Sequence, residues 1–404
     1  MTATTTTTSL DLTDPATFVT HDPLPFWREV RRHHPVYWHP GTEGRPGFWV
    51  VAGYHDIQQI YTDADTFGSA RGTVLDVLLH NDDSAGGRML AVSDRPRHRQ
   101  LRTLMQRAFS PRVLHDVAEK VRHRTVRLIE HAAQSGTLDF AADVADHIPI
   151  HTICDLLAVP EHDRRQLLEW NKQTLSAPTP DADPSVAVQA RSEIVLYFID
   201  LAEERRASPG DDVISMLATG QVGDSVLDSE DVALNCYSLI LGGDESSRMS
   251  AITTVRALAD NREQWHALRD GHLSSATAVA ELLRWATPAM HFARTATHDA
   301  TIGGQQIRAG DIVTLWNTSA NNDDSVFVEP HTLTLDRNPN KHMAFGHGPH
   351  FCVGSYLGRA TLHALLDALV STVHEIELAG DPVRIYSNFL YGYRSLPVRL
   401  HPAA

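Results

Sequence analysis

The sequence lacks the features that mark secreted, membrane-spanning and disulfide-rich proteins. It has three cysteines among 404 residues, too few and too scattered for a disulfide framework. No stretch approaches about 18 consecutive apolar residues, so no membrane-spanning helix is predicted. The first residues, MTATTTTTSLDLTD, lack the basic and apolar regions of a signal peptide. We therefore expect a cytoplasmic protein that is not bound to a membrane.

Common enzyme motifs and an excess of positive charge are also missing. Neither a G-x-x-x-x-G-K-[ST] phosphate loop nor a G-x-G-x-x-G dinucleotide loop occurs, and His374–Glu375 lacks the second histidine of a zinc-protease helix. The 35 Lys and Arg against 50 Asp and Glu give a formal charge of −15, which argues against binding to nucleic acid. ATP hydrolysis, metalloproteolysis and Rossmann-type nicotinamide binding are therefore without sequence support.

The residue pattern predicts a mainly α-helical protein with a smaller β-rich part. Helical periodicity dominates residues 95–286 and 354–374, whereas strand-like runs and alternation occur at 35–67, at 291–340 and in the C-terminal tail. One helix is unusually long, because Asp228 or Ser229 can cap a pattern that continues to about Asp260. We expect residues 1–14 to be disordered and Ser176–Val186, rich in Pro, Asp and Ala, to form an exposed connection.

The most informative segment is FGHGPHFCVG, residues 345–354, in which Cys352 stands in a glycine-rich loop directly before a predicted amphipathic helix. A helix N-terminus carries partial positive charge and free N–H groups, which stabilise a thiolate and donate hydrogen bonds to its sulfur. Gly346, Gly348 and Gly354 would let the backbone approach a flat ligand and adopt positive φ. The residues alone also allow a small buried cysteine without a function.

A second alternative for this segment is a zinc site. His342, His347, His350 and Cys352 are ligand types that suit zinc. Their spacing matches no standard zinc pattern, and no distant second pair of ligands is evident. A zinc protein of this kind would purify without colour.

Beyond these alternatives, the segment resembles the haem-ligand loop of the cytochrome P450 family. The family pattern F-x-x-G-x-x-x-C-x-G is matched in full by Phe345, Gly348, Cys352 and Gly354. Glu281 and Arg284, 71 positions before Cys352, resemble the family's structural E-x-x-R pair and would face the same side of a helix. In the long helix, LGGDESS resembles the family's oxygen-binding stretch, with matching positions at Gly242, Gly243, Glu245 and Ser246.

The resemblance also supplies candidates for binding the haem propionates. His98 and Arg102 resemble the family's H-x-x-x-R helix and would lie one turn apart, and Arg294 and His350 stand at two further matching positions. One scaffold element matches only in part, because Glu329–Leu333 lacks the arginine of the family's P-x-R-F stretch. This departure puts a role of Thr332 beside Glu281 and Arg284 in doubt.

What the resemblance implies is a single cytochrome P450 domain over residues 15–404, of the soluble bacterial type. The fold would be a helical bundle around buried haem b, with the Cys352 thiolate as axial iron ligand. The activity would be a monooxygenase reaction with O2, in which Glu245 and Ser246 handle protons. Electrons from NAD(P)H would arrive indirectly, through a reductase and a ferredoxin, and we expect a monomer.

Substrate and redox partner are implied less specifically. Ferredoxins are typically acidic, so a local basic patch is expected at Arg97, Arg99, Arg107, Arg112 and Lys341. The loop between Gly72 and Met89 would border the substrate pocket. The family positions that would line the pocket are Ser238, Leu241, Ala289, Met290, His291, Phe292, Phe389 and Leu390. This mixed set suits hydroxylation or epoxidation of a secondary-metabolite intermediate, such as a polyketide, a macrolide or a carrier-tethered amino acid.

Two other functions would keep the same cysteine. A haem-thiolate peroxygenase or a non-hydroxylating oxidative enzyme would use different distal chemistry. Comparing turnover with peroxide against turnover with ferredoxin distinguishes such an enzyme from a monooxygenase. A non-catalytic haem-binding protein would show no substrate-dependent NAD(P)H consumption. Glu245 and Ser246 would then have no evident purpose.

One prediction concerns Ser246, which stands where the family usually has threonine. Serine keeps the hydroxyl but loses the methyl group that restricts χ1, so its hydroxyl is held less firmly. We expect Ser246→Ala to release more peroxide per NAD(P)H consumed than the unmodified protein. Unchanged coupling between NAD(P)H and product would remove Ser246 from the proton pathway.

Overall fold

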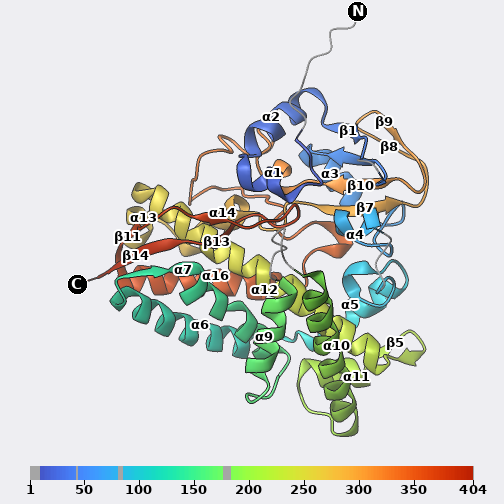
Figure 1. The fold of residues 1–404 in the computed structure, drawn as a ribbon, viewed down its shortest axis with the longest axis horizontal. Coiled ribbons are helices and arrows are strands. Elements are labelled where there is room, and N and C mark those ends of the chain that lie inside the picture. The colour runs from blue at the N-terminus through green and yellow to red at the C-terminus, as the bar shows by residue number, and fades with distance from the viewer. Residues whose placement is uncertain (1–9, 42–43, 81–84, 176–182, 404) are drawn as a thin grey trace, which may run out of the picture.

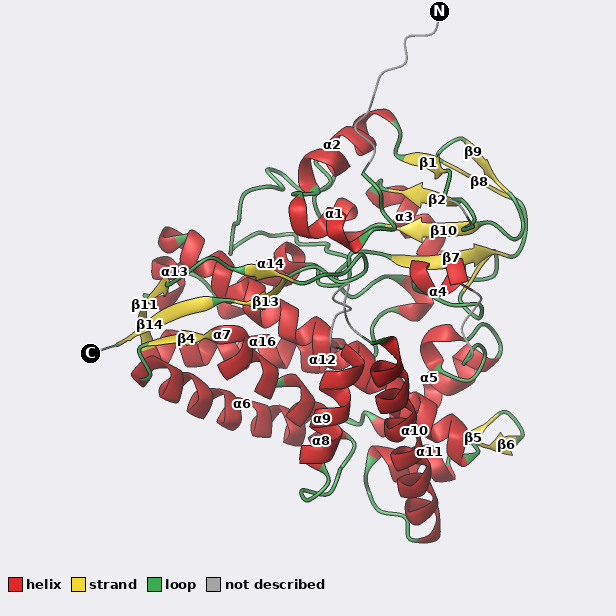
Figure 2. Ribbon diagram, in the orientation of Figure 1, coloured by secondary structure: helices red, strands yellow, loops and turns green. Residues whose placement is uncertain are grey.

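The computed structural model describes residues 10–41, 44–80, 85–175 and 183–403. A larger helical part and a smaller part built around a five-stranded sheet lie side by side, and the long helix α12 (Ser229–Asp260) runs through the middle of the view (Figures 1 and 2). No described helix is long and apolar enough to cross a bilayer. The predicted mainly α architecture is confirmed.

The helical part is formed by segments from the middle of the chain and by one late helix. Beside α12 it contains α5 (Arg97–Ala108), α6 (Pro111–Gln134), α7 (Phe140–Asp143), α8 (Pro149–Leu156), α9 (Arg164–Leu175), α10 (Pro184–Ala207), α11 (Val213–Thr219), α13 (Arg262–Arg269), α14 (Ser275–Ala286) and α16 (Ser355–Thr372), with the 3-10 turns η1 (Leu90–Val92) and η2 (Ala145–His147). Near the sheet lie α1 (Pro15–Thr20), α2 (Leu24–His33), α3 (Tyr54–Thr62), α4 (Leu75–His80) and α15 (Asn317–Ala320).

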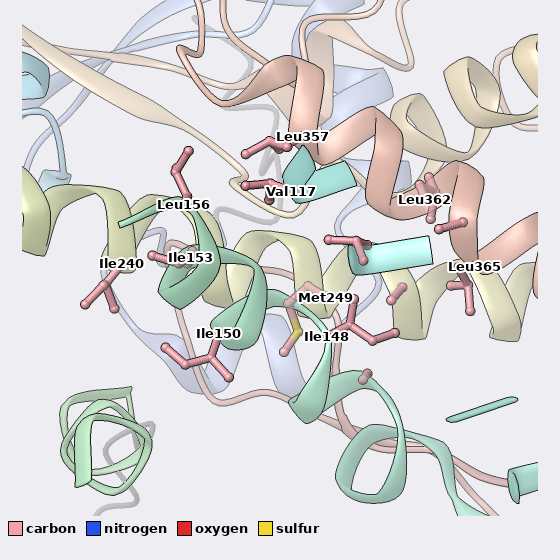
Figure 3. Packing of buried hydrophobic residues seen from close by; sticks show 14 of the residues in the cluster. Val117, Ile148, Ile150, Ile153, Leu156, Ile240, Met249, Leu357, Leu362 and Leu365 are labelled. Atoms are coloured by element: carbon pink, nitrogen blue, oxygen red, sulfur yellow. The ribbon is translucent and has the colours of Figure 1, made fainter. Parts of the chain in front are cut away.

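Helix α12 begins and ends where the sequence predicts. The Asp228 side chain accepts a hydrogen bond from the Asp231 amide at 2.7 Å, so it caps the helix and satisfies a donor that the helix leaves free. With 32 residues the helix is about 48 Å long at 1.5 Å per residue. Its apolar side chains join those of α6, α8 and α16 in one large core, part of which Figure 3 shows. This core fixes α12 relative to its neighbours.

The five-stranded sheet combines strands from both ends of the chain. Its order is β1 (Val36–His39), β2 (Phe48–Val51), β10 (Ile312–Leu315), β7 (Phe292–Ala296) and β3 (Phe67–Gly68). Strands β2 and β10 are parallel, and the other neighbours are antiparallel. In the smaller sheets, β14 (Pro397–Pro402) pairs with both β11 (Val373–Leu378) and β4 (Thr137–Asp139), β12 (Val383–Arg384) with β13 (Tyr393–Ser395), β5 (Gln221–Val222) with β6 (Ser225–Val226), and β8 (Ala300–Ile302) with β9 (Gln305–Ile307).

The β-rich part differs from the prediction inside both of its segments. Residues 35–67 include helix α3, whose buried residues Tyr54, Ile57 and Tyr61 recur at the three- to four-residue spacing of a helix. The strands of the second segment end at Leu315 rather than near residue 340. After α15 the chain is irregular until it reaches Cys352, and its conformation depends on contacts made with other parts of the chain.

The packed chain also begins before the expected boundary at residue 15. Leu12 is fully buried beside Phe18 and Trp27, and the amide of Asn388 donates to the Thr13 carbonyl at 3.1 Å. The expectation of a disordered tail is therefore wrong for residues 10–14, because this segment buries apolar surface against the tail of the chain. Residues 1–9, and residues 176–182 of the predicted exposed connection, lie outside the described residues.

Candidate functional site

Cys352 lies between the irregular segment and the first turn of α16. The Cys352 amide donates to the Phe345 carbonyl at 2.9 Å, which closes the loop that carries the cysteine. Gly348 has φ +68°, and a Cβ atom there would clash with the carbonyl oxygen of Tyr61. Only glycine fits this backbone conformation and this close approach. The loop geometry therefore explains why the glycine-rich pattern of residues 345–354 is needed.

Cys352 is partly buried and lies in a locally positive environment. Burial raises the pKa of the Cys352 thiol, while a hydrogen bond from the Gly354 amide and the charges of Arg102 and Arg359 act in the opposite direction. A metal ion bound to the sulfur would displace the proton and take over as the compensating positive charge. The Gly354 amide and the two arginines can compensate a negative charge on this sulfur.

Four basic side chains gather next to this loop, as predicted. His98 and Arg102 come from α5, Arg294 from β7 and His350 from η3 (Gly348–His350). The His98 and His350 rings are 4.0 Å apart, and the Arg102 guanidinium donates to the Phe351 carbonyl at 2.6 Å. Arg294 is almost fully buried over the Tyr61 ring.

These basic groups lack a matching anion in the described chain. Burial, together with neighbouring arginines, lowers the pKa of His98 to about 4 and that of His350 to about 2. Asp94 is the nearby carboxylate, but both of its oxygens accept hydrogen bonds from backbone amides, those of Ser69 and Ala70. The buried Nε2 atom of His98 has no hydrogen-bond partner among the described residues. The cluster fits a ligand that carries negative charge.

The middle of α12 borders open space at the turn that contains the predicted oxygen-binding stretch. A Cβ atom on Gly242 would meet nothing within 4 Å, and Leu241 is 37% exposed although the helix crosses the molecule. Gly243 is different, since a Cβ atom there would lie 3.0 Å from the Ile153 side chain of α8. One glycine therefore leaves room for a ligand, and the other lets α8 pack closely.

Glu245 and Ser246 follow on the next turn. The Ser246 hydroxyl donates to the Gly242 carbonyl at 2.7 Å, so its position is set by α12 itself. Glu245 is buried, and one of its oxygens accepts from Arg248 at 3.1 Å while the other has no partner among the described residues. Burial raises the pKa of Glu245, against the effect of Arg248. A buried acid with an oxygen that has no partner among the described residues can hold a proton.

The predicted pocket residues divide into two groups. Ala289 forms an antiparallel β-bridge with Leu390, and the Met290 amide donates to the Phe389 carbonyl at 2.9 Å. The ring centroids of Phe292 and Phe389 are 5.7 Å apart. The structure thus brings the segment after Pro288 and the tail turn together. Met290 and His291 are fully buried, whereas Phe292, Phe389 and Leu390 remain partly exposed. The partly exposed side chains are the ones available to a ligand.

His291 and Ser238 show the limits of placing pocket residues by position. The His291 ring packs 4.5 Å from Trp316 and 5.6 Å from Phe389, and its burial lowers its pKa to about 3. Ser238 and Leu241 lie apart from this group, on α12, and Ser238 is partly exposed. His291 is therefore part of the aromatic core behind the predicted pocket wall.

A buried carboxylate organises the irregular segment that leads to the cysteine. Glu281 and Arg284, both fully buried on α14, form two hydrogen bonds of 2.7 Å, as the sequence predicts. The Glu281 carboxylate also accepts from Arg337 at 2.9 Å, from Asn340 at 3.0 Å and from the Thr334 amide at 3.1 Å. Burial alone would raise the pKa of Glu281, but these donors hold it below its usual value. The carboxylate is therefore ionised and fully paired.

The two arginines extend this network to the backbone of the loop. Arg284 donates to the carbonyls of Asn321 at 2.7 Å and of Pro330 at 2.9 Å. The side chain of Asn321 in turn accepts from the Met343 amide at 2.6 Å, two residues before Phe345. Thr332 contributes to the network through its backbone carbonyl, which accepts a hydrogen bond from Arg337 at 3.1 Å.

Sequence reasoning missed two arginines of this region. Arg337 donates to the Glu281 carboxylate at 2.9 Å, and its place in DRNPN, eight positions before Phe345, was the available signal. Arg359 lies 4.6 Å from the Phe345 ring centroid. Gly358 leaves room for that ring, since a Cβ atom there would approach it to 3.3 Å. These contacts pair residues that are separated in sequence and carry no local periodicity.

The zinc alternative is not supported. In the ranges that the structure describes, no group of three or more His, Cys, Asp or Glu side chains is arranged to hold a metal ion. His350 instead faces His98, and His347 lies 3.5 Å from Gln58. A single thiolate ligand with a separate basic cluster remains as the candidate site.

Comparisons with known proteins agree with this geometry. The family model described as Cytochrome P450 matches residues 254–374. Cytochrome P450 NovI of Streptomyces niveus is 39% identical, over 97% of this chain and 96% of that protein. The steroid C26-monooxygenase of Rhodococcus jostii is 30% identical, over 96% of this chain and 84% of its own length. The solved structure of P450 OxyD, involved in the biosynthesis of vancomycin-type antibiotics, has a TM-score of 0.89 and 33% identity, and the match covers 98% of this chain and 100% of OxyD.

The residues of the site fit a haem on their own chemistry. Cys352 offers a sulfur at a partly buried position, and four basic side chains without a matching anion suit the two propionate groups. Gly242 leaves open space on the side of α12. His98, Arg102, Arg294 and His350 are thus the residues that would bind the propionates.

Replacing the central carboxylate tests the network. In Glu281→Gln, Arg284 and Arg337 lose their compensating charge inside the protein, so we expect the free energy of unfolding to fall by about 3–5 kcal/mol. Urea unfolding of the apoprotein measures this without any dependence on haem. The matched control is Glu377→Gln, since Glu377 is 57% exposed and pairs only with His401. Equal losses in the two variants would contradict the role given to Glu281.

Proposed function

The chain belongs to the cytochrome P450 family and is a monooxygenase of that family, and from this premise we propose that it hydroxylates or epoxidises a secondary-metabolite intermediate. The proposal rests chiefly on one observation: a partly buried, positively surrounded Cys352 lies beside a basic cluster, while the glycine turn of α12 borders open space. Haem b, once bound to Cys352, supplies the activation of O2 and of the substrate C–H bond.

The proposed roles of the remaining residues follow from where they lie. His98, Arg102, Arg294 and His350 bind the propionates. On the distal side, Ser246 holds its hydroxyl to the Gly242 carbonyl, and Glu245 carries a free buried oxygen from which a proton can pass to that hydroxyl. Arg248 opposes the rise in the pKa of Glu245 that burial causes. The protein thereby orients substrate and protons, while the cofactor carries out the oxidation.

The proposed substrate class is supported by the relatives and by the partly exposed pocket residues. OxyD is involved in antibiotic biosynthesis, and aromatic side chains at Phe292 and Phe389 suit a ring-containing substrate. We therefore favour a natural-product intermediate, with a carrier-tethered amino acid as the first candidate. The steroid C26-monooxygenase among the relatives makes a steroid the appropriate comparison substrate.

A ferredoxin and its reductase are the proposed source of electrons. Arg102 on α5 contacts the cysteine loop, so the outer residues of α5 and the start of α6 lie next to the ligand. Arg99, Arg107 and Arg112 are exposed there and suit an acidic partner. Arg97 is a weaker candidate than the sequence indicated, because it pairs with Asp231 at 2.7 Å.

The haem assignment is tested with the reduced, carbon monoxide-treated protein. We expect a strongly red-shifted Soret band, and its loss in Cys352→Ala, because the thiolate is the source of the shift. Cys236→Ala, which removes a cysteine buried in the core, is the control and should keep the band. A band unchanged in Cys352→Ala would assign the ligand to another residue. A protein with this band but turnover with peroxide only would be a peroxygenase.

Charge reversal tests the proposed docking surface. We expect Arg107→Glu and Arg112→Glu to raise the KM for ferredoxin severalfold and to weaken its salt dependence, since both effects follow from lost electrostatic attraction. Turnover supported by peroxide serves as the control and should stay unchanged. Charge reversal at Arg122, which pairs with Glu119 farther along α6, provides the matched variant. An equal rise in KM for the Arg122 variant would place docking elsewhere.

A further inference from the structure

A buried contact between an acid and an amide joins α9 to α12 immediately before Glu245. Asn171 on α9 is 2% exposed and Asp244 on α12 is 6% exposed. The side-chain Nδ2 of Asn171 donates to Oδ2 of Asp244. Asp244 occupies the position between Gly243 and Glu245, so the contact holds the turn that carries the proposed proton pathway.

Both partners of this hydrogen bond keep a second oxygen that is unpaired. Oδ1 of Asp244 and Oδ1 of Asn171 are buried and have no hydrogen-bond partner in the part of the chain that the structure describes. Leaving a buried acceptor without a donor is costly, and two at one contact are unusual in a native protein. A single proton on Asp244 removes both defects, because an O–H group at Oδ1 would donate to the amide oxygen of Asn171.

The charges around Asp244 also favour a proton. Arg248 contacts two carboxylates, Glu245 at 3.1 Å and Asp146 at 3.3 Å, whereas no ion pair joins Asp244 to a cation within the described ranges. Burial and the charge of Glu245 raise the pKa of Asp244 to about 7. The titratable groups facing this region are Glu245 and Arg248 on α12, Asp146 and His147 on η2, Lys172 on α9 and Cys154 on α8.

We propose that Asp244 is protonated in the folded protein and forms a two-hydrogen-bond acid–amide pair with Asn171, which positions the α12 turn carrying Glu245 and Ser246. The amide N–H donates to one carboxyl oxygen, and the carboxyl O–H donates to the amide oxygen. Asp244 is a positioning residue, since it acts on the proton pathway through the backbone of α12.

Loss of this proton would disturb the turn in two ways. The second hydrogen bond to α9 would be absent, and a negative charge on Asp244 would lie next to Glu245 in a buried site. That charge would act on the α12 turn that carries Glu245 and Ser246. The effect on coupling rests on the proposed function, whereas the protonation of Asp244 and its pairing with Asn171 do not.

The first test compares the pH dependence of unfolding in the holoprotein and in Asp244→Asn. The variant replaces the carboxyl group with an amide that forms the same two hydrogen bonds at every pH. The pKa of Asp244 is about 7 in the folded protein and near 3.8 in the unfolded protein. At pH values between these two, folding takes up one proton. The stability that this proton gives is therefore lost as pH rises from the lower value to the upper one. The unfolding constant of the protein, divided by that of the variant, should rise about tenfold per pH unit between about pH 5 and about pH 7.

A ratio that is constant or falls over this range would overturn the proposal. Histidines titrate in the same window, but they are common to both proteins and cancel in the ratio. Asp146→Asn is the matched control, because Asp146 belongs to the same cluster and does not contact Asn171. In Asp146→Asn, the pH dependence of unfolding that is lost in Asp244→Asn should remain.

Infrared difference spectroscopy supplies a second measurement that needs no variant to fold. The protein at about pH 6 should show the carbonyl stretch of a protonated carboxyl group, and this band should vanish at about pH 9. Its absence at about pH 6 would overturn the proposal even if Asp244→Asn were unstable. Where the variant folds, the band should be missing from it.

A functional measurement tests the positioning role. Peroxide released per NAD(P)H consumed should increase severalfold as pH rises from about 6 to about 8.5 in the protein, and should stay at the low value in Asp244→Asn. The same pH dependence in both proteins would overturn the positioning role. A protein without the thiolate-type carbon monoxide band would contradict the proposed function. The unfolding and infrared measurements would still determine the protonation state of Asp244.

Discussion

The carboxylate of Glu281 is the interaction on which the ligand loop depends. It lies in the protein interior, so it is stable only while all of its donors remain in place. Those donors come from α14 and from three points of the segment between α15 and Cys352. That segment has almost no regular secondary structure, and the ion-pair network takes the place of a helix or sheet. The position of the sulfur is therefore fixed by electrostatics as much as by the start of α16.

Helix α12 is held by a different kind of force. It is fixed by apolar packing against α8 and α16 (Figure 3). Near its middle, three acids lie close to one arginine: Arg248 contacts Glu245 and Asp146, and Asp244 is paired with Asn171 of α9. In a core with a purely structural role, an excess of buried acids over cations would be destabilising. Beside a site that consumes protons, it provides a group whose protonation changes near neutral pH.

Much of the site could be predicted because its residues are close in sequence or lie on one helix. The cysteine loop, the α12 stretch and the pair His98–Arg102 are local patterns, and the structure places His98 and Arg102 next to the cysteine loop. Asn171 could not be predicted, because it acts on a partner far away in the chain, and Arg337 carried only the signal of its place in DRNPN. His291 shows the reverse case, since its position indicated a pocket residue while its side chain packs on Trp316. Helix α3 was missed because its apolar spacing is embedded between strands.

The five-stranded sheet has a consequence for how the protein is made. The Thr314 hydroxyl donates to the carbonyl of Trp49, 265 positions earlier. Strand β2 therefore cannot pair with its neighbour β10 until the long stretch of chain between them has been synthesised. Arg294 belongs to the same sheet and Cys352 follows still later. Contacts of such long sequence separation form slowly, and N-terminal segments emerge from the ribosome long before their partners. The cofactor pocket is thus completed only after Cys352 has been synthesised, so the segments of the pocket that are made earlier remain without their partners until then.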